Sequence, residues 1–169
     1  MTQSPSFPRM HVSLYVADID KTVQFYDQFF DQPASKQMPK YAKYILEEPR
    51  LIISFVERPD RVQPNFGHLG FQVETKEILA AHHSRIKTTG LATLEEKGTN
   101  CCYALQDKYW VSDPDGHRWE VYYFHEDVEW NDPAYNLEKA NHENHALDQF
   151  QAQEISKAGT AGTQGMTCC

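Results

Sequence analysis

The chain carries the same strand-then-helix pattern twice, and this repeat limits the available folds more than any other feature. The first copy opens at His11 with HVSLYVAD, in which Val12, Leu14 and Val16 alternate with polar or aromatic residues. The second copy opens at His68 with HLGFQVET, and every second residue is again apolar. Such alternation is typical of a half-buried β-strand. The repeat therefore predicts an internal duplication of one small module.

A helix is predicted after each of these strands. Asp18 and Thr75 are suited to begin the helices, because their side-chain oxygens can accept hydrogen bonds from exposed backbone amides. Apolar residues then follow at helical spacing. They are Ile19, Val23, Tyr26 and Phe30 in the first helix, and Ile78, Leu79, His82 and Ile86 in the second. Gly90 is expected to end the second helix.

Short strand-like runs complete each unit. In the first unit they cover residues 41–46 and 51–56, joined by a turn at 47–50. In the second unit they cover 92–95, 103–111 and 119–124. Asp113-Pro114-Asp115-Gly116 predicts the last turn, because proline presets φ and glycine accepts a positive one. The sequence thus predicts an α+β protein whose units each contain a strand, a helix, and two or three more strands.

Length and charge restrict the kind of partner. The 169 residues suit one or two small domains, and the formal net charge is −8 without a basic cluster. Nucleic acid is therefore an unexpected partner, because neutralising phosphates takes clustered Lys and Arg. No run approaches the ~20 apolar residues needed to span a bilayer, and the first residues do not resemble a secretory signal. We expect a cytoplasmic protein that acts on a small molecule and does not bind a membrane.

The domain boundaries follow from the repeat and from a change of composition. We expect a folded domain over residues 9–125, with module one at 9–60 and module two at 66–125. Residues 126–169 are rich in Asn, Gln, Glu, Ala and Gly. We expect a polar C-terminal tail there, partly helical over 136–157 and disordered beyond Gly159.

Three residues are candidate ligands of one divalent metal. His11 and His68 each stand first in their strand, on the face opposite the aliphatic residues, and Glu120 lies among aromatic residues in RWEVYYF. A buried carboxylate must be paired, protonated or metal-bound, because burying it bare is costly. Two imidazoles and a carboxylate form the facial set of non-haem Fe(II) oxygenases, although Zn²⁺, Mn²⁺ and Ni²⁺ accept similar ligands.

The four cysteines form two adjacent pairs, Cys101-Cys102 and Cys168-Cys169. Adjacent cysteines bond to each other only with strain, so thiols are expected in a reducing compartment. The first pair follows Gly98-Thr99-Asn100, which predicts a flexible loop entering the strand that precedes Glu120. Two thiols can replace both exchangeable oxygens of a trivalent organoarsenical, R–As(OH)₂. The alternative is that the pairs are accidental.

Three segments, HVSLYVADIDKTVQFYDQFF, GHLGFQVE and DPDGHRWEVYYF, resemble the vicinal oxygen chelate superfamily over about residues 10–124. This superfamily includes glyoxalase I, extradiol dioxygenases and the bleomycin- and fosfomycin-resistance proteins. The resemblance implies paired βαβββ modules around a metal held by His11, His68 and Glu120. Glyoxalase-type members add a fourth ligand from the last strand of the first module. Only Glu57 could serve here, and it comes late in its strand, so three ligands are expected.

The motif GTNCCYA at residues 98–104 gives a closer resemblance, to the organoarsenical C–As lyases of this superfamily. These are Fe(II)-dependent dioxygenases that convert trivalent methyl- or aryl-arsenicals to arsenite with O₂. The resemblance implies that Cys101 and Cys102 bind arsenic beside iron held by the three ligands.

Two other functions stay open. Cadmium-induced proteins also resemble this chain, so it could sequester arsenic or cadmium without catalysis. It could also be a glyoxalase-like isomerase that depends on Glu57. Paired modules form within one chain or between two, so a homodimer also stays open.

Several further residues are weaker candidates. Lys108 and Tyr109 follow the thiols closely in the sequence and could lower the thiol pKa or orient O₂, although a solvated lysine is the simpler expectation. The pairs His82-His83 and His142 with His145 have metal-like spacing, but we expect neither to bind a metal. Cys168-Cys169 either delivers arsenical to the first pair or is inert.

Overall fold

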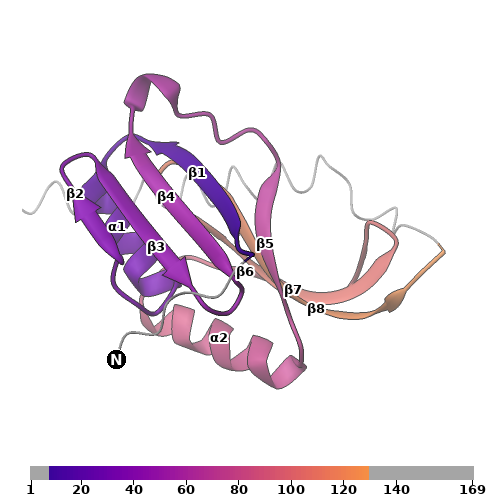
Figure 1. Cartoon of the computed structure of the whole chain (residues 1–169). Coiled ribbons are helices and arrows are strands. Elements are labelled where there is room, and N and C mark those ends of the chain that lie inside the picture. Colours follow the sequence, from indigo (N-terminus) through magenta and orange to yellow (C-terminus); the bar gives the residue numbers. More distant parts are fainter. Residues whose placement is uncertain (1–7, 130–169) are drawn as a thin grey trace, which may run out of the picture.

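The computed structural model describes residues 8–129, which form two four-stranded sheets and two α-helices (Figure 1). The first unit contains β1 (Met10–Val16), α1 (Ile19–Phe29), β2 (Lys36–Met38), β3 (Tyr41–Leu46) and β4 (Leu51–Glu57). A short 3₁₀ helix, η1 (Pro59–Arg61), leads to the second unit. That unit contains β5 (His68–Val73), α2 (Lys76–Thr88), β6 (Leu94–Cys101), β7 (Ala104–Ser112) and β8 (Arg118–Asp127).

The two sheets have the same topology, which confirms the predicted duplication and the α+β class. The strand orders are β1-β4-β3-β2 and β5-β8-β7-β6. In each sheet the first strand pairs in parallel with the last, and the other pairs are antiparallel. Each unit is therefore a βαβββ module. The three exposed residues of β2 were not predicted as a strand.

The predicted strand faces are also confirmed. In β1 the burial increases along Val12, Leu14 and Val16, while His11 stays exposed on the other face. In β5 the partly buried residues alternate with exposed ones in the same way, beginning with exposed His68. The alternation places the aliphatic residues against the helices and leaves both histidines on the opposite faces.

Both helices begin at the predicted caps. The Asp18 carboxylate accepts hydrogen bonds from the amides of Asp20 and Lys21, and the Thr75 hydroxyl accepts one from Ile78. Gly90 follows α2 with a positive φ of 80°. These bonds satisfy amides that have no partner inside the helix.

The buried face of α2 differs from the prediction. Ile78 is 45% exposed, whereas His83 is 5% exposed and packs in the interior with Leu79 and Ile86. The His83 ring stacks on Tyr109 with a centroid distance of 4.6 Å and an interplanar angle of 10°. This stacking with a residue of β7 accounts for the face that turns inward, and the local sequence does not reveal it.

The predicted loop at residues 98–100 is wrong, because β6 continues through it to Cys101. The ladder between β6 and β7 shifts register between Glu96 and Thr99, and Gly98 in that interval has a φ of +59°. A glycine in a β-bulge produces the same local sequence signal as a loop. The cysteine pair therefore lies at the end of a hairpin strand.

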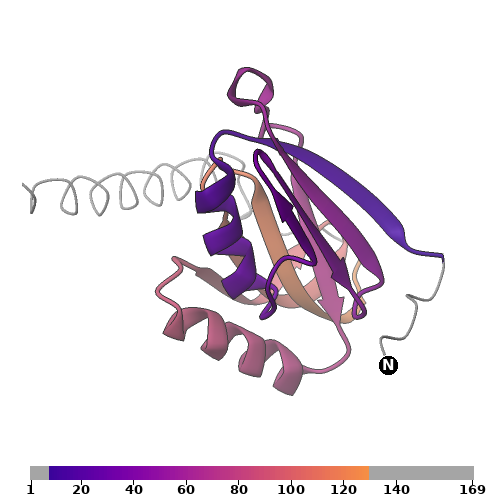
Figure 2. The same cartoon turned by 60° about the vertical axis from the view of Figure 1, so that its left-hand side comes forward.

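The two modules share one hydrophobic core, and α1 and α2 lie next to each other on one side of the strands (Figure 2). The Phe29 ring of α1 lies 5.4 Å from Trp119 of β8 and 6.2 Å from Phe71 of β5. Arg85 of α2 donates a 2.8 Å hydrogen bond to the carbonyl of Phe29. Helix α1 thus packs on the second module as well as on its own.

A buried polar network crosses the same boundary. The Tyr26 hydroxyl donates to Asp113 Oδ2 at 2.8 Å and accepts from Trp119 Nε1 at 2.9 Å. Asp113 also accepts from His117 Nδ1 at 2.8 Å and from the His117 amide at 2.8 Å. Burial and the nearby Asp113 carboxylate raise the pKa of Tyr26, so its hydroxyl stays protonated and able to donate.

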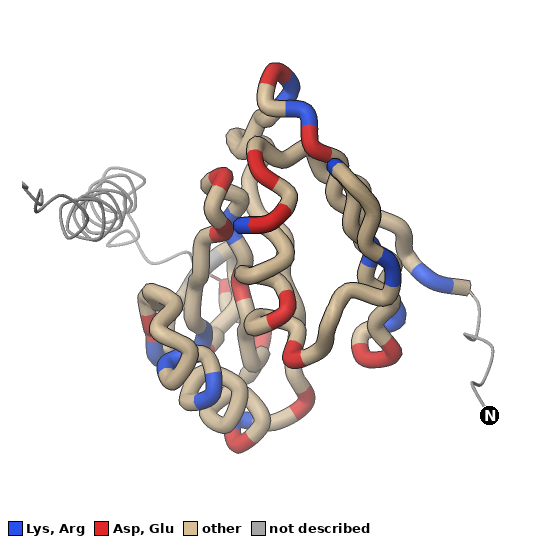
Figure 3. The backbone as a smooth tube through the Cα atoms, turned by 90° about the vertical axis from the view of Figure 1, so that its left-hand side faces the viewer, with Lys and Arg blue, Asp and Glu red and all other residues tan. Residues whose placement is uncertain are grey.

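Charged residues of both signs are dispersed along the described chain (Figure 3). Over residues 8–129 there is no helix long and apolar enough to cross a membrane. The predicted tail helix, the pair His142 and His145, and Cys168-Cys169 all lie outside the described residues.

Replacing Tyr26 with phenylalanine is expected to lower the free energy of unfolding by about 1–3 kcal/mol. The change keeps the ring but leaves the Trp119 indole N–H without its acceptor in the core. Urea denaturation of both proteins measures the difference. Tyr15→Phe is the matched control, because Tyr15 is 38% exposed and its loss should change stability by less than about 0.5 kcal/mol.

Candidate metal site and thiol hairpin

Adjacent strands of the second sheet bring together two of the three predicted metal ligands. His68 pairs with Arg118 in the ladder between β5 and β8, so Glu120 lies two residues further along on the same face. His68 Nε2 is 3.5 Å from Glu120 Oε2. Two atoms that bind one metal at about 2.1 Å lie roughly 3 Å apart, so this spacing fits a shared ion. The His68 side chain is 47% exposed, whereas Glu120 is buried.

Gly70 makes room for the carboxylate. It pairs with Glu120 in the ladder, and a Cβ at this position would lie 3.0 Å from the Glu120 carbonyl oxygen and 3.5 Å from Oε2. A side chain here would force the carboxylate or the strand to shift. The close backbone approach is the structural reason for a glycine inside β5.

Lys108 neutralises the other oxygen of Glu120. The prediction that the Lys108 side chain is solvated is wrong. The side chain is 1% exposed, and its Nζ lies 2.9 Å from Glu120 Oε1 and 3.9 Å from Glu96 Oε2. Lys108 extends from β7 onto the face that carries His68 and Glu120. The ion pair stabilises a buried carboxylate charge and leaves Oε2 directed at His68. This role could not be predicted from local sequence, because the partner of Lys108 comes from a different strand.

His11 lies on the first sheet, apart from the other two predicted ligands. Its Nε2 is 3.2 Å from the Ser54 hydroxyl of β4. In the part of the chain that the structure describes, no contact joins His11 to His68 or Glu120. The assignment of His11 as the third ligand therefore stays a prediction.

The Glu57 carboxylate, the possible fourth ligand, is bonded to other groups of the first module. Its Oε2 accepts a 3.2 Å hydrogen bond from the Ile19 amide at the start of α1, and its Oε1 lies 3.6 Å from Lys40 Nζ. Glu57 pairs with Val16, at the opposite end of the β1–β4 ladder from His11. Both observations favour three ligands over four.

A second group of possible ligands has a structural role. One ligand atom each from Asp113, Asp115 and His117 lies within 4.8 Å of the others. However, the Asp113 carboxylate already accepts four hydrogen bonds, from Tyr26, from the amide and ring of His117, and from the Asp115 amide. Asp115 Oδ1 accepts from the Ala17 amide at 3.0 Å. A cation would have to displace bonds that stabilise the turn between β7 and β8.

The cysteine pair stands at the tip of the β6–β7 hairpin. Cys101 ends β6 and pairs with Ala104, so Cys102 and Tyr103 form a two-residue turn. Both turn residues have positive φ, 56° and 64°, as in a type I′ hairpin, and the Cys102 side chain is exposed. Ala104 lies six residues before Trp110, the partner of Glu120, which corresponds to on the order of 20 Å along the strand.

Tyr109 lies in the interior rather than beside the thiols. It is fully buried, and its hydroxyl bonds to His82 Nδ1. Burial raises the pKa of Tyr109, and burial together with Arg85 lowers the pKa of His82 to about 4. These groups stay neutral near pH 7 and stabilise the core. Both histidines of α2 contact Tyr109, His82 by a hydrogen bond and His83 by ring stacking.

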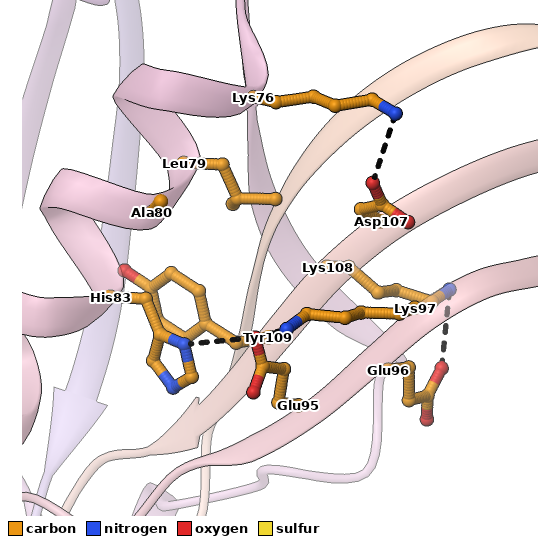
Figure 4. Close-up of a pocket in the computed structure, with 10 residues that line it drawn as sticks. All are labelled: Lys76, Leu79, Ala80, His83, Glu95, Glu96, Lys97, Asp107, Lys108 and Tyr109. Atoms are coloured by element: carbon orange, nitrogen blue, oxygen red, sulfur yellow. Dashed lines mark ion pairs between the residues drawn. The ribbon is translucent and has the colours of Figure 1, made fainter.

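A pocket of about 210 Å³ lies between α2 and strands β6 and β7 (Figure 4). Its charged side chains pair with one another: Lys76 with Asp107, His83 and Lys97 with Glu95, and Lys108 with Glu96. None of the five predicted site residues lines it. The five predicted site residues therefore lie on the two sheets and at the hairpin tip rather than in this pocket.

Replacing Lys108 with methionine is expected to lower the free energy of unfolding by about 3–5 kcal/mol in metal-free protein. The variant leaves the buried Glu120 charge without its ion-pair partner. Urea denaturation in the presence of a chelator measures the loss. Lys76→Met is the control, because Lys76 is 56% exposed and its 3.8 Å pair with Asp107 should contribute less than about 1 kcal/mol. Equal losses in the two variants would contradict a special role for Lys108.

Comparison with known proteins finds relatives of this chain with similar sequences. The chain is 42% identical over 122 residues to the trivalent organoarsenical cleaving enzyme of Bacillus sp. (strain MD1), covering 72% of this chain and 76% of that protein. It is 37% identical over 114 residues to the cadmium-induced protein CadI of Mycobacterium tuberculosis, covering 68% and 74%.

A solved glyoxalase/bleomycin resistance protein/dioxygenase from Alicyclobacillus acidocaldarius has the same fold. It superposes with a TM-score of 0.60 over 74% of this chain and 96% of that one, at 14% identity. The model of the Glyoxalase/Bleomycin resistance protein/Dioxygenase superfamily matches residues 10–121, from the start of β1 into β8. With its two βαβββ modules and this match, the chain belongs to the glyoxalase/bleomycin resistance protein/dioxygenase superfamily.

Proposed function

We propose that this protein is an enzyme that cleaves the carbon–arsenic bond of trivalent organoarsenicals, using Fe(II) and O₂, and releases arsenite. The observation that carries the proposal is the presence of two adjacent cysteines on the sheet that also holds His68 and Glu120. The 42% identity to a relative named trivalent organoarsenical cleaving enzyme supports it. The proposed role is detoxification of arsenic.

In this proposal His11, His68 and Glu120 hold the metal. The 3.5 Å separation of His68 Nε2 and Glu120 Oε2 and the burial of the carboxylate suit that role. An Fe(II) ion bound by two imidazoles and one carboxylate keeps open positions and supplies the activation of O₂. Lys108 holds the second carboxylate oxygen, so Glu120 would present a single oxygen to the metal.

Cys101 and Cys102 would bind the substrate. The two thiols exchange with both hydroxyls of R–As(OH)₂, so two As–S bonds form, two As–O bonds break and two waters leave. Arsenic then has two bonds to sulfur, and its third bond is the carbon–arsenic bond. For a methyl substrate the overall reaction is CH₃As(OH)₂ + O₂ → As(OH)₃ + HCHO, in which O₂ oxidises the carbon and arsenic stays trivalent.

The hairpin must bring the substrate to the metal ligands. The thiol tip lies on the order of 20 Å along β7 from the level of Glu120. Register shifts occur between Glu96 and Thr99 and between Leu105 and Gln106, within this interval. Bulges bend a strand pair. A bend at these positions toward the face that carries His68 and Glu120 would bring the tip closer to the metal ligands, and β7 and β8 curve along their length in Figure 1.

The alternative with independent support is a protein that sequesters arsenic or cadmium. The 37% identity to the cadmium-induced protein CadI favours it. A sequestering protein would bind arsenical through the thiols and consume no O₂. The isomerase alternative is weaker, because the Glu57 carboxylate is bonded to the start of α1.

Substitution of the metal ligands should lower the affinity for a divalent metal. We expect His68→Ala and Glu120→Ala to weaken Fe(II) or Zn²⁺ binding by at least about tenfold, and His11→Ala to do the same. Isothermal titration of the metal-free protein measures the affinity. His83→Ala is the imidazole control, and Asp115→Asn tests the Asp113 turn; both should retain normal affinity. Unchanged affinity in His11→Ala would remove His11 from the ligand set.

Arsenic speciation tests the reaction itself. Anaerobic protein loaded with Fe(II) is incubated with trivalent methylarsenical, with and without O₂. We expect arsenite and formaldehyde only when both iron and O₂ are present, with at least about a hundredfold loss in Cys101→Ser, Cys102→Ser or Glu120→Ala. Recovery of intact methylarsenical from tightly bound protein, without O₂ uptake, would support sequestration instead.

A further inference from the structure

The face of the second sheet that carries His68 and Glu120 also holds two hydrogen-bond donors that lack an acceptor within residues 8–129. The indole Nε1 of Trp110 is buried there without a hydrogen-bond partner. The Arg118 guanidinium lies over the Trp110 ring at 4.3 Å from its centroid, and no carboxylate of the described chain pairs with it.

Both donors border the predicted metal ligands. Arg118 lies two residues before Glu120 on the same face of β8 and pairs with His68 in the ladder. Trp110 pairs with Glu120, and its ring centroid lies 5.0 Å from that of His68 at an interplanar angle of 88°. The Trp110 indole therefore contacts both the Arg118 guanidinium and the His68 ring.

The two cationic side chains of this face, Lys108 and Arg118, differ in whether they have an acidic partner in the described structure. Lys108 forms a 2.9 Å ion pair with Glu120, which neutralises the buried carboxylate. Arg118 is half-buried and held by stacking, so its charge is positioned but has no acidic partner in the described structure. Burying a donor without an acceptor is costly, so such a group in a native structure points to a bound water, ion or ligand.

We infer that Arg118 and Trp110 bind an anionic substituent of the substrate and make the protein selective for trivalent arylarsenicals that carry a carboxylate. The inference rests on the proposed function for its choice of substrate and for the bend of the hairpin that brings the thiols to the metal ligands, because Arg118 pairs with Ser112, beyond Glu120 as counted from the thiol tip. A guanidinium recognises a carboxylate through two parallel N–H···O bonds. The indole N–H supplies a third donor next to the guanidinium. A methyl group or an unsubstituted phenyl ring offers these donors no acceptor.

Equilibrium binding tests the inference without turnover. Full-length protein loaded with Zn²⁺ is titrated under nitrogen with 4-carboxyphenylarsonous acid and with phenylarsonous acid. The ratio of the two dissociation constants is the readout, because the contribution of the thiols is common to both compounds and cancels. We expect the carboxylated compound to bind the natural protein at least about tenfold more tightly.

Three variants and one matched control locate the preference. Arg118→Gln should bring the ratio close to one, and Arg118→Lys should keep part of it, because the ammonium retains the charge without the planar fork. Trp110→Phe keeps the ring under the guanidinium and should lower the ratio about threefold. Arg61→Gln should keep the natural ratio, although Arg61 also lies over an aromatic ring, 4.8 Å from that of Tyr15.

A ratio near one in the natural protein, or an unchanged ratio in Arg118→Gln that still unfolds cooperatively, would overturn the inference. Benzoate distinguishes a site for the substrate from a site for free carboxylates, and binding of benzoate as tight as that of the carboxylated arsenical would also overturn it. Failure of the proposed lyase is separable, because the ratio is measured without O₂. Arsenite formation with a ratio of one would leave the lyase standing and remove the role of Arg118.

Discussion

The buried hydroxyl of Tyr26 joins the two modules, and the position of the candidate site depends on it. It donates to Asp113 in the turn between β7 and β8 and accepts from the Trp119 indole. Trp119 is 1% exposed and directly precedes Glu120. Because the bonds fix both the turn and the first residues of β8 relative to α1, they also fix the strand that presents the carboxylate. A helix of the first module thereby orients a predicted ligand of the second.

The carboxylate then organises its own surroundings. Burying Glu120 is costly unless its charge is compensated, and Lys108 supplies that compensation from the neighbouring strand. The glycine at position 70 leaves space on the other side, so the second oxygen faces His68. The result is one oxygen held by a cation of the protein and one oxygen directed at an exposed imidazole. This asymmetry suits a carboxylate that binds a metal through one atom.

The hairpin connects this site to the thiols. Strands β6 and β7 run from the level of the ion pair at Glu96 and Lys108 to the turn at Cys102 and Tyr103. The same backbone ladder therefore carries the cysteines of the proposed arsenic site at its tip and Lys108, the ion-pair partner of Glu120, at its base. One register shift interrupts this ladder and another interrupts the ladder between β7 and β8, and such bulges bend the strands between the two ends. The fold thus places the proposed thiols on the sheet that holds His68 and Glu120, whereas His11 lies on the other sheet.

The repeated pattern, the strand faces and the helix starts could be predicted from the sequence, because alternation and capping depend on residues only a few positions apart. The caps Asp18 and Thr75 were predicted in this way, as was the exposed face on which His68 lies. Folding was needed to show that β6 continues through Gly98, that His83 rather than Ile78 turns inward, and that Lys108 is buried. Each of these depends on a partner from a distant segment: the β7 ladder, the Tyr109 ring and the Glu120 carboxylate. Alternation and capping are local, whereas ion pairing and ring stacking require chain segments that only folding brings together.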